Sequence, residues 1–409
     1  MRPRGNSSRR TSVEWGVRLA LAVGAAGLGY GAVTHAIAYQ IRGSATELAY
    51  ALAPWDGRIA ALLSEKLSGA EASTADRAEA DRLARAALRL DPTAVAAAAT
   101  LGINSEIRGD RGKTLRSFAY SEKLSRRELR TQLWAIEDAV KRSDITTALY
   151  HYDIALRTSR AAPDLLFPIL ATAIADPSIR TVLANRMAAR PAWNDLLVAY
   201  VAGNGPDARA TAAFFAALNR RHVPISEIAT AALITRLLSE NHFDAAWAYY
   251  AAMTPGADRH SSHDPKFSVN RTISSPFDWT PVTDGGISAE IQRNGNDGVF
   301  DFSVPVALGG TVLRQTQLLP PGAYVLNGRS ANIEQSGRTL LYWTLSCADK
   351  RELGRVNVPP STQNDGNFAG RFTVPADCPY QQLTFVVRPS DEPSGVSGQI
   401  TSVRLHPAG

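Results

Sequence analysis

The spacing of apolar and polar residues divides the chain into three parts. An uninterrupted apolar run covers residues 19–40, alanine-rich segments with apolar residues at helical spacing continue to about residue 258, and short alternating runs fill the rest. The first run is long enough to cross a bilayer as one helix. Helical spacing predicts amphipathic helices, and short alternating runs between turn residues predict β-strands. The pattern therefore predicts a multidomain α and β chain: a transmembrane helix, an α-helical repeat domain and an antiparallel β-sandwich.

The charge distribution at the N-terminus indicates membrane topology. The chain has 409 residues and a net charge of +6, and the first eighteen residues hold Arg2, Arg4, Arg9, Arg10 and Arg18. Outside this tail the charges nearly balance, so the basic character does not indicate nucleic-acid binding. Trp15, Tyr39 and Arg42 stand where interfacial anchors belong. We expect a basic cytoplasmic tail at 1–14, an uncleaved signal anchor at 15–41, and the remainder outside the cytoplasm. Alternatively, Ala36-Ile37-Ala38 is a signal-peptidase site and the segment is a cleaved leader.

The stretch RGDRGKT at 108–114 carries two familiar motifs in an unsuitable context. A phosphate-binding loop needs a glycine at the position of Ile107. It must also follow a β-strand, whereas the residues before this stretch have the alanine-rich composition of a helix. The adhesion tripeptide needs an exposed extracellular loop. The stretch instead predicts a turn between paired helices, in which Gly109 relieves the backbone and Asp110 caps the next helix.

Aligned frames of about 34 residues begin at Ala61, Val95 and Leu129 and place alanines, turn residues and aromatics in register. This spacing resembles the tetratricopeptide repeat, although the first-helix tryptophan is absent and Trp134 is two positions out of register. The resemblance implies stacked helix pairs over 42–258, with a degenerate repeat pattern at 163–226. The groove of these pairs is expected to bind an envelope protein partner; alternatively, the pairs act as a structural spacer. The aromatic residues of WAYY at 247–250 are expected to pack between helices.

The C-terminal part predicts strands. Eight alternating segments lie at 286–292, 299–306, 311–319, 323–331, 339–347, 368–375, 382–389 and 399–407, separated by turn residues. They predict an antiparallel sandwich at 276–409, with a linker at 259–275. Cys347 and Cys378 both lie here and predict a disulfide in an oxidising compartment. The alternatives are two buried thiols, or a zinc site for which nearby partner ligands are missing.

Four motifs carry a resemblance within this domain: PFDW (276–279), VLRQTQLLPPGAYVLNGRSA (312–331), YWTLSC (342–347) and SGQITSVRLHP (397–407). They resemble the jelly-roll sandwiches of carbohydrate-binding modules and galactose-binding-like domains. The resemblance implies glycan binding, which needs exposed aromatic faces and amide partners. The candidates are Trp279, Tyr342, Trp343 and Tyr380 as platforms, with Gln315, Gln317 and Gln335 as partners. Each aromatic could instead be a core residue.

The sequence gives no catalytic, cofactor or metal prediction. His260, His263 and Asp264 are expected to be solvated in the linker, since two histidines three apart need a third fixed ligand. We therefore expect a non-enzymatic, single-pass protein of a bacterial inner membrane, with most of the chain in the periplasm. The architecture suits an adaptor in exopolysaccharide or capsule assembly and export. The alternatives are a protein-interaction scaffold, favoured if all the sandwich aromatics are buried, and a glycan-processing enzyme, which needs two close carboxylates in a cleft.

Overall fold

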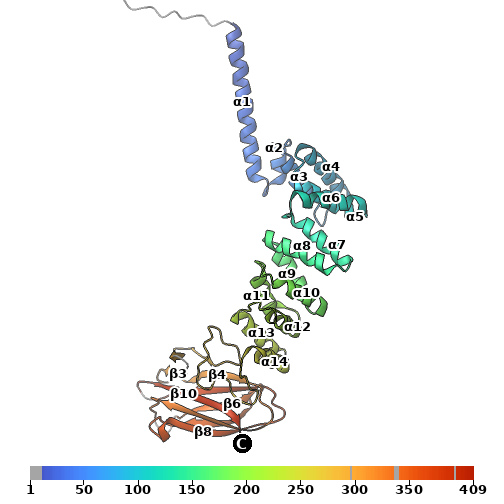
Figure 1. Ribbon diagram of the computed structural model, residues 1–409. Helices are drawn as coiled ribbons and strands as arrows, with labels where there is room; N and C mark the ends of the chain where they lie inside the picture. The colour runs from blue at the N-terminus through green and yellow to red at the C-terminus, as the bar shows by residue number, and fades with distance from the viewer. Residues whose placement is uncertain (1–11, 295–296, 336–339, 391–392) are drawn as a thin grey trace, which may run out of the picture. The chain divides into compact units, whose positions relative to one another are not determined.

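The computed structural model describes residues 12–294, 297–335, 340–390 and 393–409, and it divides into two compact units, Met1–Ala162 and Pro163–Gly409 (Figure 1). Most of the predicted basic tail, including the arginines before Arg18, lies outside the described residues. The boundary between the units falls within the predicted repeat domain, after α8 (Ile145–Thr158). The later helices therefore belong to the same unit as the strands.

The first unit opens with the apolar helix α1 (Ser12–Ile41), whose 30 residues extend about 45 Å at 1.5 Å per residue. It is long and apolar enough to cross a membrane, and its most apolar stretch is not buried against the rest of the described chain. Arg42 follows the helix and stacks on the Tyr39 ring, with Cζ 3.6 Å from the ring centroid. Its length and composition suit a signal or an anchor.

Seven shorter helices follow in the first unit: α2 (Thr46–Leu52), α3 (Gly57–Leu67), α4 (Thr74–Leu90), α5 (Val95–Ile107), α6 (Arg111–Leu124), α7 (Leu129–Lys141) and α8. Helix α2 packs on α1, and the other six form three pairs: α3 with α4, α5 with α6, and α7 with α8. Helices α5 and α7 begin at Val95 and Leu129, 34 residues apart, as the aligned frames predicted. Small residues permit this pairing, because a Cβ at Gly102 would lie 2.9 Å from the Phe118 ring. The helix pairs are confirmed, whereas the tetratricopeptide assignment stays a prediction.

The turn at RGDRGKT is confirmed in detail. Gly109 has φ +73°, and the Asp110 carboxylate accepts a hydrogen bond of 3.1 Å from the backbone N–H of Lys113. A helix, α5, precedes the turn, and a helix, α6, follows it. Because a phosphate-binding loop must follow a strand, this stretch is a capped inter-helix turn.

The second unit begins with six helices: α9 (Ala162–Ala173), α10 (Pro177–Met187), α11 (Asn194–Asn204), α12 (Ala208–Asn219), α13 (Glu227–Ser239) and α14 (Phe243–Met253). They include the region whose repeat pattern was degenerate. Three of them begin after a residue whose side chain caps the helix: Asp176 before α10, Asp207 before α12 and Ser226 before α13. The helical prediction for 163–258 is therefore confirmed.

Two five-stranded antiparallel sheets form the sandwich. One has the order β1 (Thr280–Pro281), β4 (Gly310–Gln317), β9 (Gln381–Val387), β6 (Leu341–Cys347), β7 (Glu352–Val358). The other has the order β2 (Ser288–Asn294), β3 (Asp297–Val304), β10 (Val396–Pro407), β5 (Gly322–Ala331), β8 (Asn367–Val374). Most connections cross between the two sheets, as in a jelly roll, and β2–β3 and β6–β7 are pairs within one sheet. The predicted fold class is confirmed. Strands β1 and β7 were missed, because β1 is only two residues long and Gly354 interrupts the alternating pattern of β7.

Apolar side chains from both sheets fill the space between them. Phe300 and Phe302 of β3 meet Phe385 of β9 edge-to-face, and Trp343 of β6 stacks on Phe385 with ring centroids 4.9 Å apart. Such pairs add about 0.5–1.5 kcal/mol each beyond the area they bury. This core leaves the outer faces of the two sheets as the surfaces available for binding.

The predicted linker at 259–275 is folded onto the sandwich. Ser262 exchanges hydrogen bonds with Leu405 of β10, and Pro265 accepts one from Val403. Phe267 is fully buried in the sandwich core. The prediction of a separate linker was wrong because Gly, Pro and polar residues mark irregular backbone, which can be packed as well as solvated.

Candidate functional site

The two tryptophans predicted as sugar platforms lie inside the sandwich. Trp279 is 3 % exposed and Trp343 is fully buried, with ring centroids 5.8 Å apart. The Trp279 indole N–H donates to the carbonyl of Asp264. A sugar cannot stack on a buried ring, so these residues belong to the core, which was the alternative for each of them.

The predicted amide partners also serve the fold. Gln317 donates to the Gln315 side-chain oxygen, and Gln315 donates to the carbonyl of His263 at 3.0 Å. Gln335 donates to the carbonyl of Val358 and accepts from Leu341. Because Gln315 and Gln317 are buried and hydrogen-bonded internally, they are not available to a ligand.

The two predicted tyrosines are partly exposed but lie at different places. Tyr342 is on the outer face of its sheet, where the guanidinium groups of Arg355 and Arg388 lie 4.6 and 5.0 Å from its ring centroid. Tyr380 packs on Phe243 of α14, with ring centroids 6.0 Å apart, beside a cavity of about 320 Å³. The structure therefore does not assemble the predicted glycan-binding residues into one site.

The predicted disulfide is present between Cys347 and Cys378, which are 31 residues apart in sequence. It ties the end of β6 to the segment that enters β9. Those two strands are neighbours in one sheet, so the bond closes a loop at the edge of an existing pairing.

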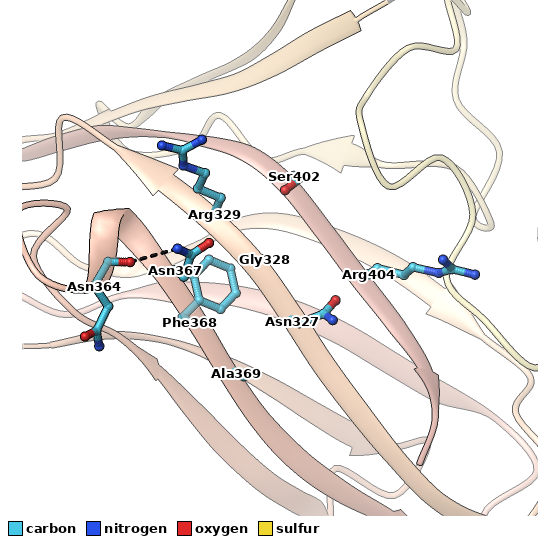
Figure 2. A pocket seen from close by; sticks show the side chains of 9 residues that line it. All are labelled: Asn327, Gly328, Arg329, Asn364, Asn367, Phe368, Ala369, Ser402 and Arg404. Carbon is cyan, nitrogen blue, oxygen red and sulfur yellow. Dashed lines mark hydrogen bonds between the residues drawn. The ribbon is translucent and has the colours of Figure 1, made fainter. Parts of the chain in front are cut away.

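A groove of about 590 Å³ lies on the outer face of the other sheet, over β10, β5 and β8. Its lining residues are Asn327, Gly328, Arg329, Asn364, Asn367, Phe368, Ala369, Ser402 and Arg404. Strand register sets the side chains in rows, since successive side chains on one face are two residues apart. One row is Ser402, Arg329 and Asn367, and the next is Arg404, Asn327 and Ala369. Figure 2 shows Arg329 and Arg404 extending in different directions from neighbouring strands.

Internal hydrogen bonds position part of this groove and leave ligand-binding groups free. Asn367 donates to the carbonyl of Asn364 at 2.8 Å, and the Arg329 Nε–H donates to the carbonyl of Asp365 at 3.1 Å (Figure 2 shows the first). These bonds leave the Asn367 amide oxygen and the terminal nitrogens of Arg329 to face solvent. The groove thus presents both acceptors and donors on a rigid sheet.

Two glycines give the groove its shape. A Cβ at Gly328 would lie 2.4 Å from the Phe368 ring, so the absence of a side chain lets that ring pack beneath the surface. Gly366 has φ +75°, and a Cβ there would lie 2.1 Å from the Ser330 carbonyl oxygen. This close approach fixes the turn that carries Asn364 and Asn367.

The lining residues suit binding and offer little for acid–base chemistry. None of them is Asp, Glu, His or Cys. Across the described residues, no group of three or more His, Cys, Asp and Glu side chains is arranged to hold a metal ion. The lining amides, hydroxyl and guanidinium groups can form hydrogen bonds and ion pairs.

A separate polar cluster is buried where α14 meets the sandwich. The Asp278 carboxylate accepts from Tyr250 Oη at 2.9 Å and from the Ser275 backbone and hydroxyl, and it lies 3.3 Å from Arg271 Nε. Burial, reinforced by the nearby Asp278 carboxylate, raises the pKa of Tyr250. The space beside this cluster is only about 10 Å³, so it joins the elements and holds no ligand.

The histidines of the predicted linker do not form a site. His260 is exposed and hydrogen-bonds Asp258, whereas His263 is largely buried edge-on to Tyr250, with ring centroids 5.8 Å apart. Burial lowers the pKa of His263, against smaller opposing effects from Asp278 and Asp264. The expectation that His263 is solvated was wrong, since the segment is packed.

The groove residues were missed by sequence reasoning although their signal was present. Asn327 and Arg329 alternate with apolar residues in one predicted strand, and Ser402 and Arg404 do so in another. Alternation assigns each pair to the outer face of its strand. It does not indicate that the two strands pair, which brings the residues together.

No family model matches the chain, and no curated protein matches it. Among solved structures, similarity is found to the enzymatically active domain of tailspike protein 4 from bacteriophage CBA120 (15% identity, 31% of this chain, 18% of that chain, TM-score 0.23). A CBM22-1 xylan-binding domain from Paenibacillus barcinonensis is similar at 12% identity (38% of this chain, 97% of that domain, TM-score 0.25). A glycosylation-associated Gap123 complex from Streptococcus agalactiae is similar at 12% identity (29% of this chain, 38% of that chain, TM-score 0.20). The chain thus spans under a fifth of the tailspike domain. At these TM-scores the likenesses carry no argument about function, which has to come from the groove itself.

Proposed function

We propose that this chain is a non-catalytic envelope adaptor, anchored by α1 in a bacterial inner membrane, whose sandwich binds a glycan in the groove over β10, β5 and β8. In this proposal most of the chain lies in the periplasm and the helices hold an envelope protein partner. Assembly or export of exopolysaccharide or capsule is the process that such an architecture suits. The apolar helix and the disulfide support the location, because disulfides persist in oxidising compartments.

The observation that carries the proposal is the row of exposed amide, hydroxyl and guanidinium groups on a rigid sheet. Asn327, Asn367 and Ser402 offer both donors and acceptors, which matches the hydroxyl groups of a sugar. Neighbouring strands lie about 4.8 Å apart, so one row can contact several hydroxyls of a chain laid across it. The lining residues come from three adjacent strands, so an extended polymer can lie across them.

The test is binding of the full chain, purified in detergent, to immobilised bacterial polysaccharides by biolayer interferometry. Because a neutral hydrogen bond is worth about 0.5–1.5 kcal/mol, Asn327→Ala and Asn367→Ala should each weaken binding roughly three- to tenfold. Asn357→Ala is the matched control, since Asn357 is exposed on the opposite sheet. If no polysaccharide binds, or if the control weakens binding as much as the groove variants, the proposed function fails.

A protein-interaction scaffold is the second candidate, and two observations favour it. The sandwich tryptophans are buried, and the glycan groove has no exposed aromatic ring. In addition, a groove of about 520 Å³ between α12 and α14 is lined mainly by alanines, with Tyr249 and Met253 among the larger side chains. If the chain binds no glycan, the sandwich is instead assigned to protein interaction.

A further inference from the structure

The three rows of side chains on the outer face of β10, β5 and β8 contain an arginine each. Arg329 lies in the first row, Arg404 in the second, and Arg371 in the third, beside Val325 and His406. We propose that the ligand of this groove is an acidic polysaccharide, whose carboxylate, sulfate or phosphate groups bind these guanidinium groups. The inference rests on the proposed glycan-binding function and specifies its ligand class.

The charges of all three arginines are unpaired among the described residues. They are exposed, and none forms an ion pair with any residue that the structure describes. Arg371 and Arg404 form no hydrogen bond within the described chain either, and Arg329 uses only its Nε–H, to a backbone carbonyl. Other arginines of the chain do have a carboxylate partner, as Arg58 has in Asp91. The groove therefore holds cations that remain available to a ligand.

The charges nearby do not neutralise this surface. The three rows contain no Asp or Glu. The next row of the sheet holds Asp301, whose carboxylate accepts from Gln399, and Asp365 gives Arg329 its carbonyl and not its carboxylate. Side chains diagonal to each other on adjacent strands are about 7–8 Å apart, so Arg329 and Arg404 repel weakly in the free protein. An anionic ligand would remove that repulsion.

The same surface is poorly suited to a neutral sugar. Neutral glycans gain much of their affinity by stacking pyranose C–H groups on an aromatic face. The only aromatic lining the groove is Phe368, which is buried beneath Gly328. A guanidinium group instead binds a carboxylate or phosphate through two parallel N–H···O bonds, which are about twice as strong as neutral hydrogen bonds. The residue types present therefore select for acid groups.

The test compares sugars that differ in charge alone. The full chain in detergent is bound to polygalacturonate and to its methyl ester, and to dextran sulfate and dextran, with polyglutamate as an anion without sugar. At least one acidic polysaccharide should bind more than about tenfold more tightly than its neutral partner, and the pair that does so identifies the acid. Arg404→Gln should weaken that binding at least about tenfold, which corresponds to about 1.4 kcal/mol. Binding should also weaken as salt is raised, because exposed charges are screened.

Arg314→Gln is the matched control, because Arg314 is exposed on the opposite sheet and its replacement removes the same charge. It should leave binding unchanged. Equal affinity for polygalacturonate and its methyl ester, and for dextran sulfate and dextran, would overturn the acidic ligand while leaving glycan binding intact. Equal binding of polyglutamate, lost equally in Arg404→Gln, would overturn it in favour of a general anion site. Binding of none of the polysaccharides would overturn both the inference and the proposed function.

Discussion

Replacing Asp278 should separate α14 from the sandwich. Asp278 is 6 % exposed, and its carboxylate holds together three parts of the second unit: Tyr250 of α14, Ser275 of the segment before the first strand, and Arg271. In Asp278→Ala the Tyr250 hydroxyl and the Arg271 guanidinium lose their partner in a place that water reaches poorly. The cost is therefore the desolvation of the groups left behind in addition to the lost bonds.

The size of the effect follows from the geometry. Removing one partner of a buried ion pair costs about 3–5 kcal/mol. Arg271 keeps some contact with solvent, with 22 % of its side chain exposed, and retains a hydrogen bond to Thr254. The lower end, about 3 kcal/mol, is thus the expected loss. Tyr250→Phe removes one hydrogen bond to the carboxylate and should cost about 1.5–3 kcal/mol.

Hydrogen exchange measured by mass spectrometry is the suitable assay, because a chain of two units does not unfold in a single transition. The opening free energy of α14 amides should fall by about 3 kcal/mol in Asp278→Ala. Amides of the central strands β6 and β9 should change less. Asp377→Ala is the control, since Asp377 is an exposed carboxylate paired with Arg351 at the surface, and it should leave exchange in α14 unchanged.

Two results would refute the reasoning. One is unchanged exchange of α14 in Asp278→Ala, which would mean that apolar contacts of Tyr250 and Phe277 alone hold the helix. The other is a double variant with Tyr250→Phe whose loss equals the sum of the single losses. Side chains in direct contact should instead show a coupling free energy of at least about 0.5 kcal/mol.

Three further predictions concern stability and the groove. Replacing Cys347 and Cys378 by serine should destabilise the sandwich by about 3–4 kcal/mol, as closure of a 31-residue loop implies, and thermal unfolding with and without reductant measures it. Burial lowers the pKa of His263, so the unfolded state binds more protons. Stability should be complete above pH about 6.5, fall as pH drops from there towards the lower folded-state pKa, and level off below it. In His263→Phe the loss of stability at low pH should be smaller, as measured by thermal unfolding at a series of pH values. An unchanged loss would contradict the role of His263. Gly366→Ala places a methyl group against the Ser330 carbonyl at positive φ, and should cost about 1–3 kcal/mol in chemical denaturation and weaken glycan binding in the same interferometry assay.

Elements with a strong local pattern were predictable from the sequence. The helix starts at Val95 and Leu129 follow from alanine spacing, and Asp110 follows from the chemistry of helix caps. Eight strands follow from alternation. These features depend on neighbours within a few residues, which is the range over which backbone preferences act.

The candidate site was not predictable in the same way. An aromatic side chain can pack in a core or stack on a sugar, and composition does not distinguish these two roles. Trp279 and Trp343 were predicted as sugar platforms, but both are buried. The groove depends on β10 pairing with β5, although 64 residues lie between the end of β5 and the start of β10. Only the pairing brings Arg404 next to Asn327. Sequence alternation identified which residues face outward, but not which outward residues share a surface.

The burial of the aromatic residues changes which kind of ligand the sandwich is suited to bind. Rings that fill the core, as Trp343 and Phe385 do, cannot also form a sugar platform, so affinity has to come from the polar groups of the outer face. On the face formed by β10, β5 and β8 those groups include three arginines without acidic partners among the described residues. Hydrogen bonds to neutral sugar hydroxyls contribute about 0.5–1.5 kcal/mol each, whereas charge-assisted bonds contribute about 1.5–3 kcal/mol each. Because this groove has no aromatic stacking surface, we expect it to gain most of its affinity from the acid groups of a ligand.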